Sequence, residues 1–146
     1  MLNIFVIIVL IIIHTGCDGK PKHMGLAMYD AIQFLESPGY PNNYPNNADC
    51  IWIIESERLQ DVRAVRIDFD VFETENGSDF LEIRDGKDSS GILLGRFHGH
   101  RDSSFKVVSH SEAMWIQFHS NSQKTYKGFV GQYMSVRKNR LRKIKG

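Results

Sequence analysis

Apolar and polar side chains alternate along much of this chain with a period of two. In the segment AVRIDFDVF, three charged residues separate four apolar ones, which are Val65, Ile67, Phe69 and Val71. Successive side chains of a β-strand point to opposite faces of its sheet. The alternation therefore predicts a strand with one apolar face and one charged face.

Further segments repeat this scheme. The inward rows that it predicts are Cys50, Trp52 and Ile54 in CIWIIE, Leu81 and Ile83 in DFLEIRDG, and Met114, Ile116 and Phe118 in AMWIQFHS, and GFVGQYMSV closes the series. Gly, Asn, Asp and Ser lie between these short segments, and none shows a convincing helical stripe. The pattern predicts an all-β sandwich, with Trp52 and Trp115 more often core residues than sugar platforms.

The N-terminus has a different pattern. MLNIFVIIVLIII is an apolar run of the length of a signal-peptide core and shorter than the roughly 20 residues of a membrane-spanning helix. We interpret residues 1–17 as a signal peptide, because cleavage after Cys17 leaves the small residues Thr15 and Cys17 at the recognised positions. A retained anchor is the alternative. The mature protein is then predicted to be secreted, with a linker over residues 18–23.

Cysteine usage leaves three alternatives open. The chain holds only Cys17 and Cys50, and the predicted cleavage would remove Cys17. A buried, unpaired thiol at Cys50 is the first alternative, and it is the one we favour from the sequence. A Cys17–Cys50 disulfide and an intermolecular disulfide are the other two.

Charge is unevenly distributed. Residues 18–136 hold 12 Lys and Arg against 17 Asp and Glu, a net charge of −5, whereas the tail 137–146 carries six basic residues and no acid. The six are Arg137, Lys138, Arg140, Arg142, Lys143 and Lys145. Such a tail is either a solvated end or a strip that binds sulfated polyanions such as heparan sulfate.

Four segments together resemble a known family. SPGYPNNYPNNADCIWII is similar to the opening signature of CUB domains, and FDVFETENGSDFLEIRDG, LLGRFHG and IQFHSNSQKTYKGFVGQY are similar to three later segments in the same order. The resemblance covers residues 24–136. It implies a jelly-roll-like β-sandwich of two antiparallel sheets with about ten strands, which acts outside cells as a binding module. The prolines of the opening run also predict a rigid approach to the strand at Cys50.

The chain departs from the family at its cysteines. Family members usually carry four cysteines in two bridges, but here only Cys50 stands at a matching place. Met24-Gly25 lie where the first is expected, Gly77-Ser78 where the third is, and His98 where the fourth is. The sequence therefore predicts a domain that folds without a disulfide inside the sandwich.

Acidic residues are concentrated between Asp68 and Asp85, where there are seven carboxylates and a single base, Arg84. We expect Asp68, Asp70, Glu82 and Asp85 to be solvated strand-face or turn residues. Glu75 and Asp79 flank a short turn, so both can approach one hard cation such as calcium. The resemblance implies that Glu75, Asp79 and Asn121 are calcium ligands, with an Asn in place of the family's third Asp, and that Tyr44 lies beside them.

The same turn contains a sequon. Asn76-Gly77-Ser78 is an N-glycosylation sequence, and a glycan on Asn76 would lie between the two proposed calcium ligands. The glycan and a calcium-centred binding surface would therefore compete for this loop.

These features predict a function in binding and not in catalysis. No nucleophile-elbow motif such as Gly-x-Ser-x-Gly is present, and the chain is too short for a cleft around Glu75 and Asp79. We expect a secreted protein-interaction module that binds basic residues of a partner through Tyr44, Glu75 and Asp79 on a calcium-organised loop. The alternatives are a spermadhesin-like protein that binds glycans or heparan sulfate with its basic tail, and a structural or inhibitory fragment.

Overall fold

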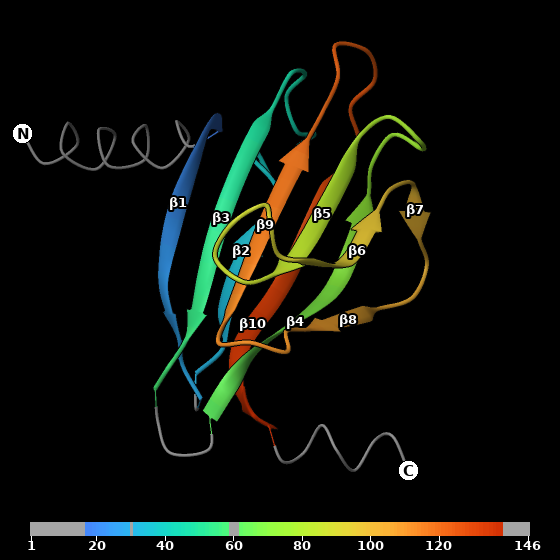
Figure 1. The fold of residues 1–146 in the computed structure, drawn as a ribbon. Coiled ribbons are helices and arrows are strands. Elements are labelled where there is room, and N and C mark those ends of the chain that lie inside the picture. Colours follow the sequence, from blue (N-terminus) through green and yellow to red (C-terminus); the bar gives the residue numbers. More distant parts are fainter. Residues whose placement is uncertain (1–16, 30, 59–61, 139–146) are drawn as a thin grey trace, which may run out of the picture.

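The computed structural model describes residues 17–29, 31–58 and 62–138, which form ten strands in two packed sheets (Figure 1). The strands are β1 (Asp18–Ala27), β2 (Gln33–Glu36), β3 (Asp49–Ser56), β4 (Val62–Glu73), β5 (Phe80–Asp85), β6 (Ile92–Phe97), β7 (His100–Arg101), β8 (Phe105–Val108), β9 (Ala113–His119) and β10 (Gly128–Arg137). The first sheet has the order β1-β3-β9-β5-β6, and the second has the order β2-β10-β4-β7, with β8 also paired to β4. The predicted all-β sandwich is confirmed. No helix among these residues is long and apolar enough to cross a membrane.

The first strand corrects the prediction of a linker over residues 18–23. These residues form the first part of β1, which pairs in parallel with β3 from Asp18 opposite Asp49 to Ala27 opposite Ser56. The other strand pairs are antiparallel. Pro21 is tolerated because β1 is an edge strand, where one side of the backbone needs no partner, and the register shifts between Asp18 and Pro21. Strand β1 contains a proline and two lysines, so it lacks the alternation of apolar residues by which the other strands were predicted.

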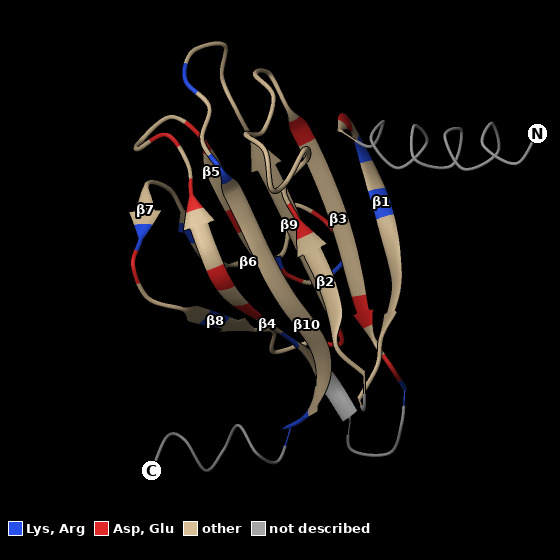
Figure 2. Cartoon of the chain, turned by 180° about the vertical axis from the view of Figure 1, so that it is seen from behind, with Lys and Arg blue, Asp and Glu red and all other residues tan. Residues whose placement is uncertain are grey.

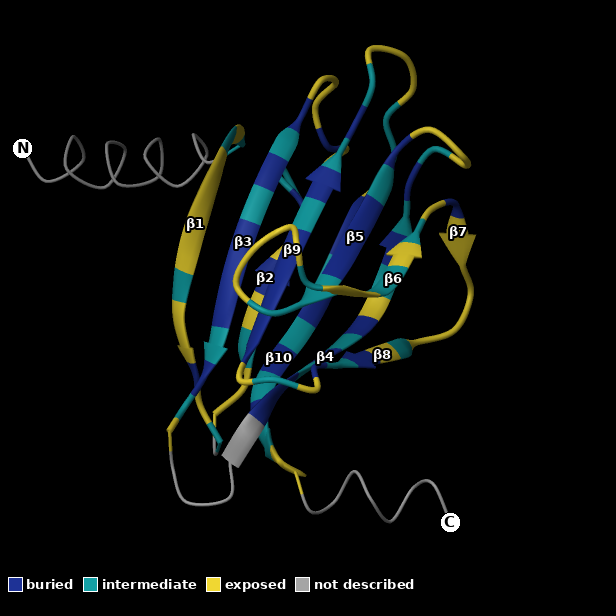
Figure 3. Cartoon of the chain, in the orientation of Figure 1, coloured by how far each residue is buried: buried dark blue, intermediate teal, exposed yellow. Residues whose placement is uncertain are grey.

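The core lies between the two sheets and contains the predicted inward rows (Figure 3). The buried residues from those rows are Cys50, Trp52, Ile54, Val65, Ile67, Phe69, Leu81, Ile83, Met114, Ile116 and Phe118. Trp115 is buried as well, but on the outward row of β9, so it is absent from the cluster that fills the sandwich.

Val71 departs from the predicted row because β4 contains a bulge. Val130 of β10 pairs with Val71 and the next residue, Gly131, pairs with Phe69, so Asp70 has no partner in the register. An extra residue shifts the alternation by one position. Phe72 is therefore buried in the core, whereas Val71 is only partly buried.

Phenylalanine rings contact one another across the core. The Phe69 ring stacks on Phe105 at a centroid distance of 5.0 Å, and Phe72 stacks on Phe129 at 6.1 Å. Phe118 meets Phe129 edge-on at 5.4 Å. Aromatic pairs in these geometries stabilise a core by about 0.5–1.5 kcal/mol each beyond the area they bury.

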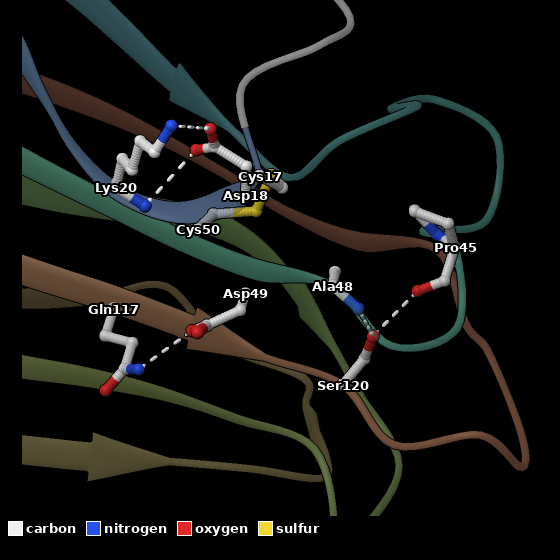
Figure 4. The surroundings of a disulfide bond; sticks show 9 residues. All are labelled: Cys17, Asp18, Lys20, Pro45, Ala48, Asp49, Cys50, Gln117 and Ser120. Atoms are coloured by element: carbon white, nitrogen blue, oxygen red, sulfur yellow. Dashed lines mark hydrogen bonds and ion pairs between the residues drawn. A yellow bond between two sulfur atoms is a disulfide. The ribbon is translucent and has the colours of Figure 1, made fainter.

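A disulfide joins Cys17 to Cys50, across a sequence separation of 33 residues (Figure 4). The expected unpaired thiol at Cys50 and the expected absence of a disulfide in the domain are therefore both wrong. The bridge connects the residue before β1 to β3, close to the segment from Pro45 to Ala48. A mature chain that began at Asp18 would lack the bridge, so cleavage after Cys17 and this disulfide exclude each other. Residues 1–16 of the predicted signal peptide lie outside the described residues.

Candidate functional site

Loops from both sheets meet at one end of the sandwich, which we call the loop end. It comprises the connections β2–β3, β4–β5, β6–β7 and β9–β10, of which three lie at the top of Figure 1. The proline-rich opening run is the β2–β3 connection and is held against the β9–β10 side of the domain. Ser37 N–H donates to Phe129 O at 2.9 Å, and Tyr44 N–H donates to Tyr126 O at 3.1 Å. The predicted rigid approach to β3 thus fixes the position of Tyr44.

Tyr44 is a buried hydrogen-bonding centre. Its hydroxyl donates to Asp79 Oδ2 at 2.7 Å and accepts the backbone N–H of Glu75 at 3.0 Å. Its ring packs edge-on against Phe118, with centroids 5.0 Å apart. Burial raises the pKa of the Tyr44 hydroxyl well above its usual value, and the hydrogen bond to Asp79 raises it further. Tyr44 therefore stays protonated and remains a donor to Asp79.

Asp79 is completely buried and connects two loops. Its Oδ1 accepts the backbone N–H of Asn121 at 2.8 Å, while Oδ2 accepts the Tyr44 hydroxyl. Its backbone carbonyl accepts the Thr74 hydroxyl at 3.2 Å. A buried carboxylate needs such partners because its desolvation is otherwise unfavourable by several kcal/mol.

Asn121 connects Glu75 to the loops that precede β3 and β10. Its side-chain Nδ2 donates to Glu75 Oε2 at 2.7 Å, and its Oδ1 accepts the backbone N–H of Gln123 at 2.8 Å. Its backbone carbonyl accepts Asn47 N–H at 2.8 Å. Asn121 therefore touches three loop segments with four polar atoms.

The structure thus brings together all four residues that the resemblance placed at the site. We call Tyr44, Glu75, Asp79 and Asn121 the loop cluster. Sequence reasoning missed Thr74, whose hydroxyl also accepts Gly99 N–H at 3.0 Å and so joins the β6–β7 connection to the cluster. Nothing in the sequence marks Thr74, because its role depends on the position of a distant loop.

The sequon residue Asn76 is exposed at the tip of the β4–β5 loop. Its Oδ1 lies 2.8 Å from Nδ1 of His98, and this same nitrogen lies 3.2 Å from the backbone N of Gly77. Gly77 and His98 occupy the regions where the family's third and fourth cysteines are expected. A polar contact through His98 Nδ1 therefore connects the two loops where the resemblance implies a disulfide.

The other carboxylates of the acidic segment differ among themselves. Figure 2 shows acidic residues recurring along β4, where Asp68 pairs with Arg66 at 2.7 Å. Glu82 is not solvated as expected, since it is 8% exposed. Its carboxylate pairs with Arg84 at 2.6 Å and Arg96 at 3.7 Å, and these two cations cover it on the outer face of the first sheet. Asp68 and Glu82 are therefore paired with a base, whereas Glu75 and Asp79 form no ion pair among the described residues.

The side-chain atoms that the loop cluster offers as ligands do not fit a calcium ion in their present arrangement. Calcium takes six to eight oxygen ligands, and an N–H group cannot serve as one. The side-chain N–H of Asn121 points toward Glu75, and its side-chain oxygen Oδ1 accepts the backbone N–H of Gln123 instead.

The basic tail begins at the opposite end of the molecule. Arg137 is the last residue of β10, and its guanidinium lies 5.0 Å from the centre of the Tyr29 ring. Arg137 and Lys138 are both exposed. Arg140, Arg142, Lys143 and Lys145 lie outside the described residues.

The structural class of this domain is a two-sheet β-sandwich with a polar cluster at its loop end. Comparison with known proteins gives its family. The model of the CUB domain family matches residues 23–133, and the chain belongs to that family. CUB domains are non-catalytic modules that serve as extracellular interaction domains in homologous proteins. This match confirms the resemblance found in the sequence.

Individual similarities agree with this assignment. Rat cubilin is 36% identical over 106 residues, which is 71% of this chain and 3% of cubilin. The CUB1-EGF-CUB2 domains of rat MASP-1 superpose with a TM-score of 0.64 at 21% identity, covering 80% of this chain and 43% of that chain. The MASP-1 CUB2 domain bound to Ca2+ superposes with a TM-score of 0.60 at 23% identity, covering 77% of this chain and 99% of that chain. The chain spans only a small part of cubilin's length, and the two structural likenesses concern the fold alone.

Proposed function

We propose that this chain is an extracellular protein-interaction module whose loop end binds a Lys or Arg side chain of a partner protein through Glu75. One observation carries the proposal. Asn121 holds one carboxylate oxygen of Glu75, while no base among the described residues pairs with the other. A fixed carboxylate at a loop surface is preorganised to accept a charge-assisted hydrogen bond from an ammonium or guanidinium group.

Tyr44 and Asp79 support the binding without touching the partner directly. Both are buried, with exposed fractions of 1% and 0%, whereas Glu75 is partly exposed. The Tyr44 hydroxyl holds the backbone N–H of Glu75 and thereby fixes where the Glu75 side chain starts. This refines the expected partner-binding set, in which all three residues had the same role.

Calcium has no role in this proposal. The Ca2+-bound MASP-1 CUB2 domain and the convergence of Glu75 and Asp79 favour a calcium-organised loop, as the sequence suggested. The direction of the Asn121 amide speaks against it, because a donor group faces the position where an ion would need an oxygen. We therefore assign the order of the loop end to the hydrogen bonds of the loop cluster.

A peptide array tests the binding proposal. Each Lys-containing peptide is paired with a peptide in which Gln replaces Lys, and the probes are the secreted, deglycosylated wild type, Glu75→Gln and Glu112→Gln. Glu112 is an exposed acid in the connection before β9, at the other end of the sandwich, so it matches the loss of charge. A hydrogen bond to a charged group contributes about 1.5–3 kcal/mol, so we expect Glu75→Gln to weaken Lys-dependent binding by about tenfold or more. Equal binding by the wild type and Glu75→Gln would refute the proposal.

The peptide array uses deglycosylated protein because Asn76, the residue that a glycan would modify, is exposed and next to Glu75. We propose an N-linked glycan on Asn76 as the competing use of this loop, since the Asn76 side chain is accessible in a sequon and a glycan there would lie beside Glu75. Intact mass before and after enzymatic deglycosylation tests this, and an Asn76→Gln variant whose mass differs from that of the wild type only by the added methylene group would contradict it. The same spectrum reports whether the mature chain retains Cys17.

The basic tail gives a second candidate function, which is binding to sulfated glycans. The supporting observation is charge: six basic residues in 137–146 follow a body of net charge −5, and Arg137 and Lys138 are exposed. Counterion release would make such binding steeply dependent on salt. Deletion of residues 137–146 should abolish retention on heparin, and unchanged retention would exclude this function.

A further inference from the structure

Asn121 contacts both acidic side chains of the loop cluster. Glu75 and Asp79 are two acids on one short loop, and Asp79 is entirely removed from water. Asn121 donates an N–H to each of them, from Nδ2 to Glu75 Oε2 at 2.7 Å and from its backbone to Asp79 Oδ1 at 2.8 Å. Two N–H dipoles of one residue thus point at two carboxylates.

The direction of the Asn121 amide is determined by its neighbours. Oδ1 accepts the backbone N–H of Gln123 at 2.8 Å, and Nδ2 donates to a carboxylate that can only accept. A reversed amide would set Nδ2 against the N–H of Gln123 and Oδ1 against the oxygen of Glu75. Both contacts would then be repulsive, so the network selects a single orientation in which the donor faces the acids.

We propose that Asn121 takes the place of a cation at this loop end, so that the loop cluster is closed and ordered without calcium. The amide stabilises the Glu75 carboxylate by a hydrogen bond, and the backbone N–H together with the Tyr44 hydroxyl satisfies Asp79. An Asp at this position would instead place a third carboxylate oxygen close to Glu75, an arrangement that needs a bound cation. The identity of residue 121 therefore determines whether the loops depend on calcium. This inference concerns the folding of the loops and does not rest on the proposed partner binding.

Thermal unfolding of the full secreted chain tests the inference, in EDTA and in about 10 mM calcium, a concentration well above the dissociation constants of weak extracellular sites. The Tm of the wild type should be the same in both. The Tm of Asn121→Asp should be lower by about 5 °C or more in EDTA, and calcium should restore most of the loss. Ser122→Asp is the matched control, because residue 122 is exposed and the added charge is the same. This control should behave like the wild type in both buffers.

Three results with the wild type and Asn121→Asp would overturn the inference. The first is a rise in the wild-type Tm with calcium that Glu75→Gln abolishes. The second is an Asn121→Asp protein that is as stable as the wild type in EDTA, and the third is an Asn121→Asp protein to which calcium restores no stability. If Asn121→Asp is obtained only in the presence of calcium, unfolding on transfer to EDTA supports the inference.

A second variant separates the lost amide from the added charge. Asn121→Ala removes the donor to Glu75 and adds no carboxylate, so its Tm should fall in both buffers without a response to calcium. An unchanged Tm for Asn121→Ala would also overturn the inference. None of these measurements uses a partner, so failure of the peptide-binding proposal would leave their outcome unaffected.

Discussion

Asp79 shows how much of the loop end depends on one side chain. It is an acid with no exposed surface, and its three accepting atoms take hydrogen bonds from Tyr44, Asn121 and Thr74, which lie in different parts of the chain. Removal of one partner of a buried hydrogen-bonded pair leaves the other desolvated and unpaired. The cluster should therefore lose stability as a unit.

We expect Asp79→Ala to lower the free energy of unfolding by about 2–4 kcal/mol, because a buried hydroxyl and a backbone N–H lose their acceptor. Urea denaturation measures this. Asp102→Ala is the control, since the Asp102 side chain is 95% exposed and its removal should change stability by less than about 0.5 kcal/mol. A loss for Asp79→Ala no larger than that of the control would contradict the described network.

Tyr44 gives the domain a sensitivity to alkaline pH. Burial raises its pKa in the folded state above the unfolded value of 10.0, so the unfolded chain releases this proton first as pH rises. The contribution of Tyr44 to stability is thus fully present below pH 10 and declines above it, by up to about 1.4 kcal/mol per pH unit.

The prediction is that the difference in Tm between the wild type and Tyr44→Phe narrows from pH 9 to pH 11. Tyr133 also has a raised pKa through burial, but it is present in both proteins and its effect cancels. A difference in Tm that stays constant over this range would show that Tyr44 ionises equally easily in both states.

The sequence predicted the members of the loop cluster but not their connections. Tyr44, Glu75, Asp79 and Asn121 could be identified because their motifs match those of a family. The donor direction at Asn121 and the burial of Glu82 could not, because each depends on groups brought close by folding. Arg96 reaches Glu82 from the neighbouring strand β6, which local patterns do not report.

At the scale of elements, alternation of apolar residues identified strands well where one face is buried. It failed at the bulge of β4, where Asp70 shifts the phase and replaces Val71 by Phe72 in the core. It also failed for β1, whose edge position leaves most of its residues exposed. A strand that buries no continuous row has no period of two to detect.

The start of β10 is a close approach between elements that only glycine permits. Gly128 has a φ of 85°, and a Cβ there would overlap the Ser37 side chain and lie 3.4 Å from the ring of Tyr44. Gly77 has a similar φ of 81° but open space around it. We expect Gly128→Ala to destabilise the domain by about 3 kcal/mol or more and Gly77→Ala by about 1 kcal/mol, measured by urea denaturation. Equal losses would mean that backbone strain alone is responsible.

At the scale of the whole molecule, the disulfide is the main feature that sequence reasoning assigned wrongly. Cys17 follows the apolar N-terminal run after His14, Thr15 and Gly16, and it lies seven residues before Met24, where the family places its first cysteine. The prediction therefore assigned it to the cleaved peptide. The strand β1 resolves the discrepancy, because its parallel pairing with β3 brings Cys17 beside Cys50.

The bridge should contribute substantially to stability. Closing a loop of this length lowers the entropy of the unfolded chain by an amount worth about 3–4 kcal/mol. We predict that a reducing agent lowers the Tm of the wild type by on the order of 10 °C and leaves that of a Cys17→Ser, Cys50→Ala double variant unchanged. A wild-type Tm that resists reduction would show that the bridge adds nothing.

The positions of Cys17 and Arg137 also determine at which end of the sandwich a neighbouring segment or a tether is attached. Cys17 is fixed beside the start of β3, next to the loop end, whereas Arg137 pairs with Val62 at the far end of the sandwich. A tether attached at Cys17 would therefore start at the loop end, and one attached at Arg137 would start at the opposite end. Coupling the domain to a surface through Arg137 would thus leave the loop end facing outward.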